Sequence, residues 1–278
     1  MQSENESQDG RAAEGRAGDL LTLAEEATSP AARADLLREA AEELARLRRF
    51  VAARAVLGEL VALDASRHGA RERLEELRRA AVGQESGARF GKVLVFSGHM
   101  TDAPGRARER FPARKEPAVR GRIEAQLDEW GVGAGDLAIS SAARGGDLLF
   151  AEACRARGAE VWLFIALPDE EFLEESVRGA EGDWERRYRD LLAREGVRTF
   201  WQPERLGPAP EGSCVFARTN VWMINVARAE ADDPRNLYAI LVWDEKPTGD
   251  GPGGTSDFAA RVRRVGGHLA PVVNPTLL

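Results

Sequence analysis

The sequence predicts an α/β fold: a doubly wound, mostly parallel sheet of Rossmann-like type from about Lys92 to the C-terminus, preceded by a small α-helical region. Beyond Lys92, short apolar runs alternate with segments of helical periodicity. The runs show no polar alternation, which is typical of strands buried on both faces. Between Pro30 and Val82, by contrast, apolar residues recur only at helical spacing. Because helices between buried strands form crossovers, we expect about six strands in one sheet.

The first 91 residues are expected to contain three segments. Residues 1–18 are polar and have no apolar signal-peptide segment, which predicts a disordered tail. Residues 19–82 predict a helical hairpin and a third helix, with Pro30 in a first helical turn and a break at 64–66. Residues 83–91 contain glycines in a polar stretch and predict a linker, after which 92–278 form one domain.

The elements of that domain follow from the alternation of the two patterns. The predicted strands are 93–96, 137–140, 161–167, 197–201, 237–243 and 269–273. The predicted helices are 118–130, 147–157, 183–194, 214–231 and 256–265. Ligands of such sheets bind beyond the carboxyl ends of the strands, so these ends are the places to search for a site.

Composition excludes several classes of protein. The net charge of -7, from 46 acidic and 39 basic residues, implies no basic face and argues against nucleic acid as a partner. No apolar run approaches the ~20 residues of a membrane span. Cys154 and Cys214 are far apart, and His68, His99 and His268 are scattered, so we expect no metal and no cofactor in a reduced cytoplasmic protein.

The first predicted strand ends in "FSGHMTDAPGR". Ser97 and Gly98 can form a tight turn whose amides and hydroxyl face an anion, and His99 lies in the same loop. A turn that merely needs glycine is an equal alternative.

The second strand ends in "ISSAARGGD" before a helix. Flexible glycine backbone, one cation and free helix N-terminal amides meet there, as a phosphate requires. Asp147 either caps this helix or accepts a ribose hydroxyl. The candidate ligand contacts of this loop are Ser140, Ser141, Arg144, Gly145, Gly146 and Asp147.

The fifth strand is followed by "GPGGT", directly before a helix. A bound anion would meet the amides of Gly253, Gly254 and Thr255 and the Thr255 hydroxyl. The loop lacks the Gly-Lys-Ser/Thr of a P-loop, and the first turn does not match G-x-G-x-x-G. The sequence therefore supports neither a P-loop NTPase nor a dinucleotide dehydrogenase.

Taken in order, "VLVFSGHM", "SSAARGGDLLFAEACRARGAEVWL" and "GPGGT" resemble the SLOG superfamily over 92–274. This superfamily unites the DNA-processing protein A and Lonely Guy families with nucleotide-sensing domains of bacterial signalling and defence systems. The resemblance implies a Rossmannoid nucleotide-binding domain. The ligand contacts that it implies are Ser97, Gly98, Arg144, Gly145, Gly146, Gly254 and Thr255.

Catalysis of the Lonely Guy type is not expected. Those enzymes hydrolyse nucleoside monophosphates with an Arg and with a Glu three residues beyond the Thr of their glycine-rich turn. Phe258 occupies that place here, and Asp257 lies one residue earlier. One residue on a helix changes the direction of a side chain by about 100°, which should turn the carboxylate away.

The segment 167–188 could form a lid whose Ser176 and Arg178 close on the ligand. The alternative is an exposed charged loop with Phe172 and Trp184 in the core. The helical region resembles one tetratricopeptide repeat, with "LVALDA" where that family often has "ALELDP". A generic helical bundle fits its pattern equally well.

Three functions remain open. The first is a sensor that binds a nucleotide-derived small molecule and signals through its helical region to a protein partner or a second copy, so that we expect a homo-oligomer. The second is a nucleotide N-glycosidase, or phosphoribohydrolase, that uses Asp257 or Asp147. The third is a non-catalytic scaffold with a vestigial pocket.

Overall fold

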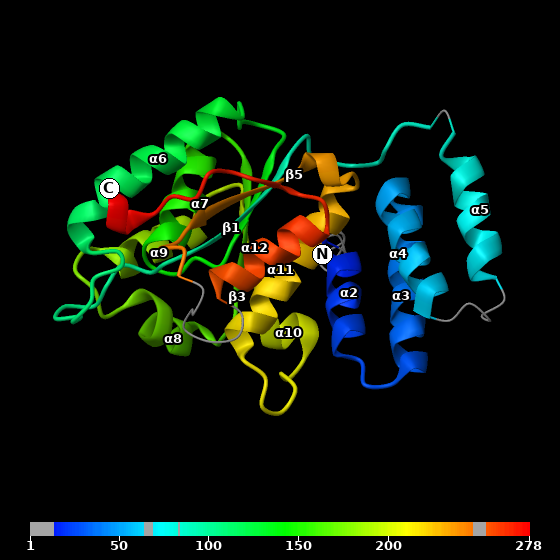
Figure 1. Cartoon of the computed structure of the whole chain (residues 1–278), viewed down its shortest axis with the longest axis horizontal. Coiled ribbons are helices and arrows are strands. Elements are labelled where there is room, and N and C mark those ends of the chain that lie inside the picture. Colours follow the sequence, from blue (N-terminus) through cyan, green and yellow to red (C-terminus); the bar gives the residue numbers. More distant parts are fainter. Residues whose placement is uncertain (1–13, 64–68, 83, 247–253) are drawn as a thin grey trace, which may run out of the picture. The chain divides into compact units, whose positions relative to one another are not determined.

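The computed structural model describes residues 14–63, 69–82, 84–246 and 254–278 (Figure 1). Contacts divide the chain into two compact units. The helical unit comprises Met1–Arg89 together with Asn225–Asp233, and the α/β unit comprises Phe90–Ile224 and Pro234–Leu278. No helix within the described ranges is long and apolar enough to cross a membrane.

The α/β unit is built on a six-stranded sheet of order β4-β3-β2-β1-β5-β6 in which all neighbours are parallel. This confirms the predicted fold class. The strands are β1 (Val93–Gly98), β2 (Leu137–Ser140), β3 (Glu160–Ile165), β4 (Val197–Trp201), β5 (Leu237–Val242) and β6 (His268–Leu269).

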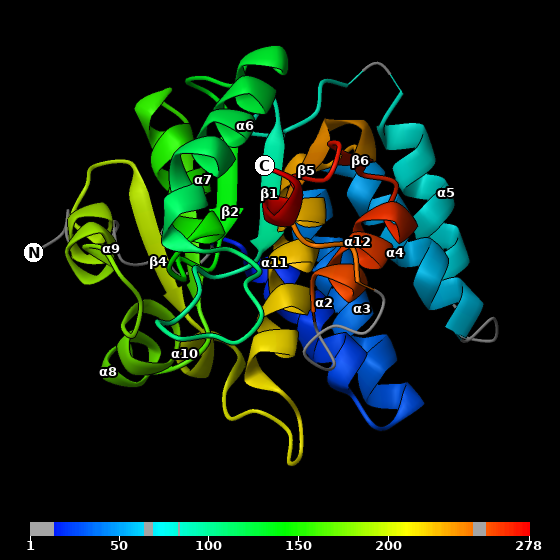
Figure 2. The same ribbon diagram turned by 60° about the vertical axis from the view of Figure 1, so that its left-hand side comes forward.

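Helices cover both faces of this sheet, which explains the continuous apolar runs of its strands. Leu94 and Phe96 of β1 belong to a core that includes Val119 and Leu148, from two helices of one face. On the other face the ring of Phe164 lies 4.5 Å from that of Trp222. Helices α6 (Glu116–Glu129), α7 (Gly146–Ala156) and α9 (Trp184–Leu192) cover the first face, and α11 (Val215–Ala231) and α12 (Thr255–Arg264) cover the second (Figure 2).

Strand order creates a switch point between β1 and β5. The chain first adds β2, β3 and β4 outward on one side of β1, and then returns to add β5 and β6 on the other side. Helix α6, which follows β1, and helix α12, which follows β5, lie on opposite faces of the sheet (Figure 2). A crevice opens at such a point beyond the carboxyl ends of the two strands.

Shorter helices connect these elements: α8 (Asp169–Phe172), the π-helix η2 (Leu173–Val177), α10 (Gln202–Leu206), and the 3-10 helices η1 (Ala113–Lys115), η3 (Pro234–Asn236) and η4 (Pro275–Leu277).

Among its described residues, the helical unit contains the three predicted helices and one before them: α2 (Arg16–Glu26), α3 (Pro30–Arg46), α4 (Phe50–Leu63) and α5 (Ala70–Ala80). The last residues of α11 also belong to this unit. Pro30 opens α3 as predicted, and the Ala32 amide donates a 3.0 Å hydrogen bond to the Ser29 side chain, which caps the helix. The predicted break at 64–66 lies outside the described residues.

The expected tail 1–18 differs from the structure at its end, where α2 begins at Arg16. Ala17 and Gly18 are buried. A Cβ atom on Gly18 would lie 2.4 Å from the Cα atom of Val226, so only glycine allows this approach. The partner that orders α2 is far away in the sequence, and local composition gave no sign of it. Residues 1–13 lie outside the described part of the chain.

The segment Asn225–Asp233 is tied to the N-terminal helices by buried polar contacts. The Arg49 guanidinium donates hydrogen bonds of 2.9 and 2.6 Å to the two carboxylate oxygens of Glu230, and both side chains are less than a tenth exposed. Asp232 accepts hydrogen bonds from the Ala52 amide at 3.0 Å and the Ser86 hydroxyl at 2.7 Å. The helical unit is therefore completed by residues that the sequence analysis had placed within the α/β domain.

Candidate functional site

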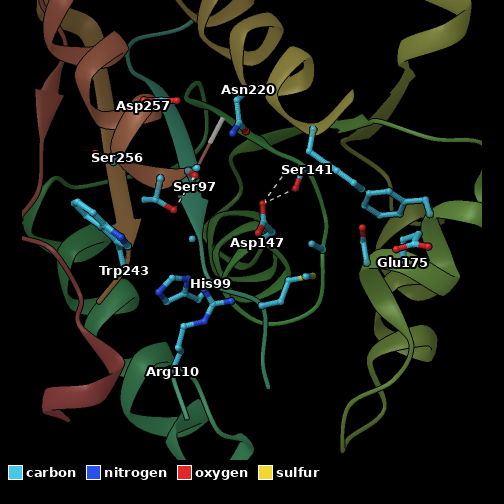
Figure 3. Close-up of a pocket in the computed structure, with 18 residues that line it drawn as sticks. Ser97, His99, Arg110, Ser141, Asp147, Glu175, Asn220, Trp243, Ser256 and Asp257 are labelled. Atoms are coloured by element: carbon cyan, nitrogen blue, oxygen red, sulfur yellow. Dashed lines mark hydrogen bonds between the residues drawn. The ribbon is translucent and has the colours of Figure 1, made fainter. Parts of the chain in front are cut away.

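A cavity of about 410 Å³ lies at the switch point of the α/β unit (Figure 3). Its walls come from the ends of β1 and β5, the first turns of α7, α11 and α12, and the segment that follows β3. We call it the switch-point cavity. Of the predicted site residues, those that line it are Ser97, Gly98, His99, Ser141, Asp147, Ser176, Gly254, Thr255 and Asp257.

The remaining predicted residues lie elsewhere. Ser140, Arg144, Gly145, Gly146 and Arg178 are described but do not line the cavity. Gly253 falls in 247–253, outside the described residues.

The glycines of the first two loops serve the packing of the chain against itself. A Cβ atom on Gly98 would lie 2.8 Å from Cβ of Val242, its partner on β5. Gly145 has φ +88°, and a Cβ atom there would lie 2.6 Å from the Thr101 nitrogen. A Cβ atom on Gly146 would lie 2.6 Å from the Phe96 ring. Gly98 needs glycine because β1 and β5 approach closely there, Gly145 because the loop after β1 packs against the start of α7, and Gly146 because α7 packs on β1.

In the turn before α7, where a phosphate was predicted, backbone amides already donate hydrogen bonds to acceptors of the protein itself. The Gly146 amide donates to the His99 carbonyl at 3.3 Å, and the Arg144 amide donates to the Ser176 carbonyl at 2.9 Å. The Ser141 amide donates to the Asp147 carboxylate at 3.3 Å. These three N–H groups are not available to a ligand, which corrects the expectation for this loop.

The Arg144 side chain connects two loops by hydrogen bonds. Its guanidinium donates to the carbonyls of Thr101 at 3.1 Å and Arg178 at 2.7 Å. The residue is only 9% exposed, and burial lowers the pKa of its guanidinium. We therefore assign it a structural role in place of the predicted phosphate contact.

Asp147 is a nearly buried carboxylate on the cavity wall (Figure 3). It is 4% exposed, and one oxygen, Oδ1, accepts hydrogen bonds from the Ser140 hydroxyl at 3.3 Å and the Ser141 hydroxyl at 2.7 Å. Burial raises the pKa of Asp147 to about 6, although these hydrogen bonds act in the opposite direction. Asp147 does not cap α7, since the cap residue is Gly145 and no side-chain cap hydrogen bond is present there.

His99 is held by the residue that follows Trp243. Its Nε2 atom lies 3.2 Å from both the amide nitrogen and Oδ1 of Asp244. Burial alone would raise the pKa of Asp244, but hydrogen bonds from Lys246 and His99 hold it at about 2. The imidazole thus has a fixed orientation at the end of β1.

The first turn of α12 forms another wall. Gly254, Thr255, Ser256 and Asp257 all line the cavity, and the Ser97 hydroxyl lies 3.5 Å from the Thr255 hydroxyl. Phe258 is fully buried in the core. Asp257 also lies on the cavity wall, and the expectation that its carboxylate is turned away stays a prediction.

The segment after β3 contributes a wall but not the predicted pair of lid residues. Phe172, Glu175 and Ser176 line the cavity. Arg178 instead forms ion pairs with Glu185, at 2.7 Å, and with Glu174. The aromatic ring of Phe172 is buried, as the alternative interpretation of this segment expected.

Nine lining residues were not among the predicted site residues: Met100, Arg110, Ala143, Phe172, Glu175, Phe216, Asn220, Trp243 and Ser256. Trp243 directly follows β5, so the rule on strand ends was sufficient to find it. Phe216 and Asn220 are four residues apart at the start of α11 and share one face of that helix. Arg110 carried no local signal, because it lies in a long connection after β1.

Among the described residues no group of three or more His, Cys, Asp or Glu side chains could hold a metal ion. The cavity offers hydroxyls, carboxylates, one guanidinium and aromatic rings. These groups suit an organic ligand with both polar and apolar parts.

No family model matches the chain, and no curated protein matches its sequence. Among solved structures, the chain is similar to DNA processing protein A of Streptococcus pneumoniae, with a TM-score of 0.31 and 15% identity over 80% of this chain and 85% of that chain. A similarity at this level assigns no function. The fold class rests on the observed sheet.

Proposed function

We propose that the α/β unit binds a nucleotide or nucleotide-derived small molecule in the switch-point cavity and acts as the sensing domain of a bacterial signalling or defence protein. The helical unit would pass the bound state to a protein partner or a second copy of the chain. The observation that carries this proposal is the coincidence of the cavity with the switch point of a parallel sheet and with the first turn of α12.

The α12 turn is suited to the anionic part of such a ligand. The first N–H groups of a helix have no acceptor within the helix, and the helix dipole favours negative charge at this end. The hydroxyls of Ser97 and Thr255 lie beside this turn and add donors from two elements. A phosphate group would meet both kinds of donor here.

The base of a nucleotide needs an apolar surface, and exposed apolar side chains of the cavity provide one. Only five large apolar side chains of the described residues are exposed, and two of them, Met100 at 37% and Phe216 at 42%, line this cavity. Trp243 lines it as well. Aromatic and sulfur-containing side chains pack well against flat heterocycles.

A substitution at Gly254 tests the anion site. Its backbone, with φ -68° and ψ 175°, is open to any residue, so Gly254→Asp should keep the fold. Two like charges ~4 Å apart repel by about 4 kcal/mol at an effective dielectric constant of ~20, which is nearly a thousandfold in affinity. Gly254→Asn is the matched control of similar shape without the charge.

Calorimetry of the three proteins with nucleoside mono- and diphosphates and NAD measures the effect. We expect binding by the wild type, a modest loss in Gly254→Asn and no measurable binding in Gly254→Asp. Equal affinity in all three proteins would place the ligand elsewhere. Absence of binding by every nucleotide would favour a scaffold with a vestigial pocket.

A hydrolase is the second candidate, and one observation favours it: the carboxyl group of Asp147, with its pKa of about 6, shares the cavity with Asp257. A group with that pKa can give or take a proton near neutral pH. Release of free base from nucleoside monophosphates, lost in Asp147→Asn or Asp257→Asn, would assign this activity. Binding without base release would assign a sensor.

A further inference from the structure

The two carboxylate oxygens of Asp147 have different surroundings. Three hydrogen bonds end on Oδ1, from the Ser140 hydroxyl, the Ser141 amide and the Ser141 hydroxyl, at 3.3, 3.3 and 2.7 Å. No other described residue donates a hydrogen bond to Oδ2. Oδ2 is also not one of the fully buried side-chain atoms without a hydrogen-bond partner. Asp147 lines the cavity, so we take Oδ2 as the oxygen that is available to a ligand there.

The fold itself has no need for the negative charge at this position. Tying the start of α7 to the end of β2 requires only an acceptor, and the amide oxygen of an asparagine would supply one. Burying an ionised carboxylate is costly unless its hydrogen bonds are complete. Here the donors from other residues all end on Oδ1, and the backbone amide of Asp147 itself adds one further hydrogen bond to the carboxylate. A ligand that donates to Oδ2 would complete the hydrogen bonds of the carboxylate.

Hydroxyl donors match this oxygen better than a cation does. The three donors on Oδ1 and the positive end of the α7 dipole already compensate much of the charge. The guanidinium of Arg110 also lines the cavity and would repel a cationic ligand group. Glu175 and Asp257 lie on the walls too, so a cationic ligand is the alternative that a test must separate.

We propose that the Asp147 carboxylate accepts hydrogen bonds from the 2′- and 3′-hydroxyls of a ribose. The switch-point cavity would then select ribonucleotides over deoxyribonucleotides. This inference rests on the proposed nucleotide-binding function. Ser141 acts as a positioning residue, since its amide and hydroxyl fix the carboxylate so that Oδ2 faces the ligand.

The test compares the affinities of ribonucleotides and deoxyribonucleotides for the wild-type protein and for single-residue variants. The probes are AMP, GMP, CMP and UMP with their 2′-deoxy and 3′-deoxy counterparts, and the proteins are the wild type, Asp147→Asn and Asp190→Asn, studied by calorimetry. A hydrogen bond to a charged group corresponds to on the order of 10- to 100-fold in affinity. We expect the wild type to prefer the ribonucleotide by this factor.

Asp147→Asn should bind ribo- and deoxyribonucleotides about equally, while Asp190→Asn, which removes the same charge from α9 outside the cavity, should keep the preference. Ser141→Ala should reduce the preference without abolishing it. If nucleotides bind but the wild type shows no preference, or Asp147→Asn retains it, the inference is wrong and the proposed function stands. If none of the probes binds to the wild type, the inference and the proposed function for these nucleotides both fail.

Discussion

The carboxyl group of Asp147 links protonation to the stability of the α/β unit. Its pKa is raised from 3.8 to about 6 in the folded protein, chiefly by burial. Between these pH values the folded state binds more protons than the unfolded state, so stability rises as the pH falls through about 6. Above that pH the buried charge destabilises the fold, and below about 4 the penalty is absent because both states are protonated.

Asp147→Asn should therefore stabilise the protein at pH 7.5. The asparagine keeps an acceptor for Ser140 and Ser141 without the charge, and a shift of about two pKa units corresponds to at most about 3 kcal/mol. Urea unfolding at pH 7.5 and at pH 4 measures the difference, which should nearly vanish at the lower pH. Ser141→Ala is the control in the opposite direction, since it removes the 2.7 Å donor and should destabilise the protein more at pH 7.5 than at pH 4. An Asp147→Asn protein that is less stable at pH 7.5 would contradict this assignment.

Among the elements, the contact between the loop after β1 and the start of α7 sets the shape of the cavity. Gly145 allows it, with φ +88° and the Thr101 nitrogen 2.6 Å from the place of a Cβ atom. Gly146 extends it through a hydrogen bond to the His99 carbonyl. The glycines thus hold the loop that carries His99 and Met100 in place.

Gly145→Ala should cost clearly more stability than Gly105→Ala. Both glycines have positive φ, at +88° and +78°, but a Cβ atom on Gly105 would have no neighbour within 4 Å. Gly105→Ala should therefore cost only the roughly 1–2 kcal/mol of a left-handed alanine, and Gly145→Ala should add the displacement of a packed loop. Thermal unfolding of the two variants compares them. Equal losses of stability in the two variants would mean that the loop after β1 moves aside for the new methyl group at no cost in free energy.

Elements that depend on local pattern were predictable, and roles that depend on distant neighbours were not. The strands at 137–140 and 197–201 coincide with β2 and β4, because buried parallel strands leave uninterrupted apolar runs. The glycines before α7 were equally visible, but a glycine permits the approach of a ligand or of another chain segment, and sequence does not distinguish the two. Arg110 and Phe216 reach the cavity only through the tertiary fold.

For the molecule as a whole, the two units do not correspond to two continuous pieces of chain. The boundary on the N-terminal side falls between Arg89 and Phe90, whereas Asn225–Asp233 belongs with the N-terminal helices. The polar contacts of Arg49 with Glu230 and of Ala52 with Asp232 lie within the helical unit. One cut of the chain therefore leaves the helical unit incomplete.

Two fragments should behave differently for this reason. Residues 89–278 retain the whole sheet and are expected to unfold cooperatively in urea. Residues 14–89 lack the partner of Arg49, and loss of one member of a buried ion pair costs about 3–5 kcal/mol, so we expect weak helicity and no cooperative transition. Circular dichroism of both fragments checks this. An insoluble 89–278 fragment, or a 14–89 fragment that unfolds cooperatively, would show that the division is drawn in the wrong place.

The Arg49–Glu230 pair also sets an order of events during synthesis on the ribosome. The two residues are 181 positions apart, and at about 5–20 residues per second roughly 10–35 s pass between their additions to the growing chain. During that interval the N-terminal helices are present without the segment that closes their core. A ribosome that stalls before residue 225 therefore holds a nascent chain whose first helices expose a guanidinium and an apolar surface, which are targets for chaperones and proteases.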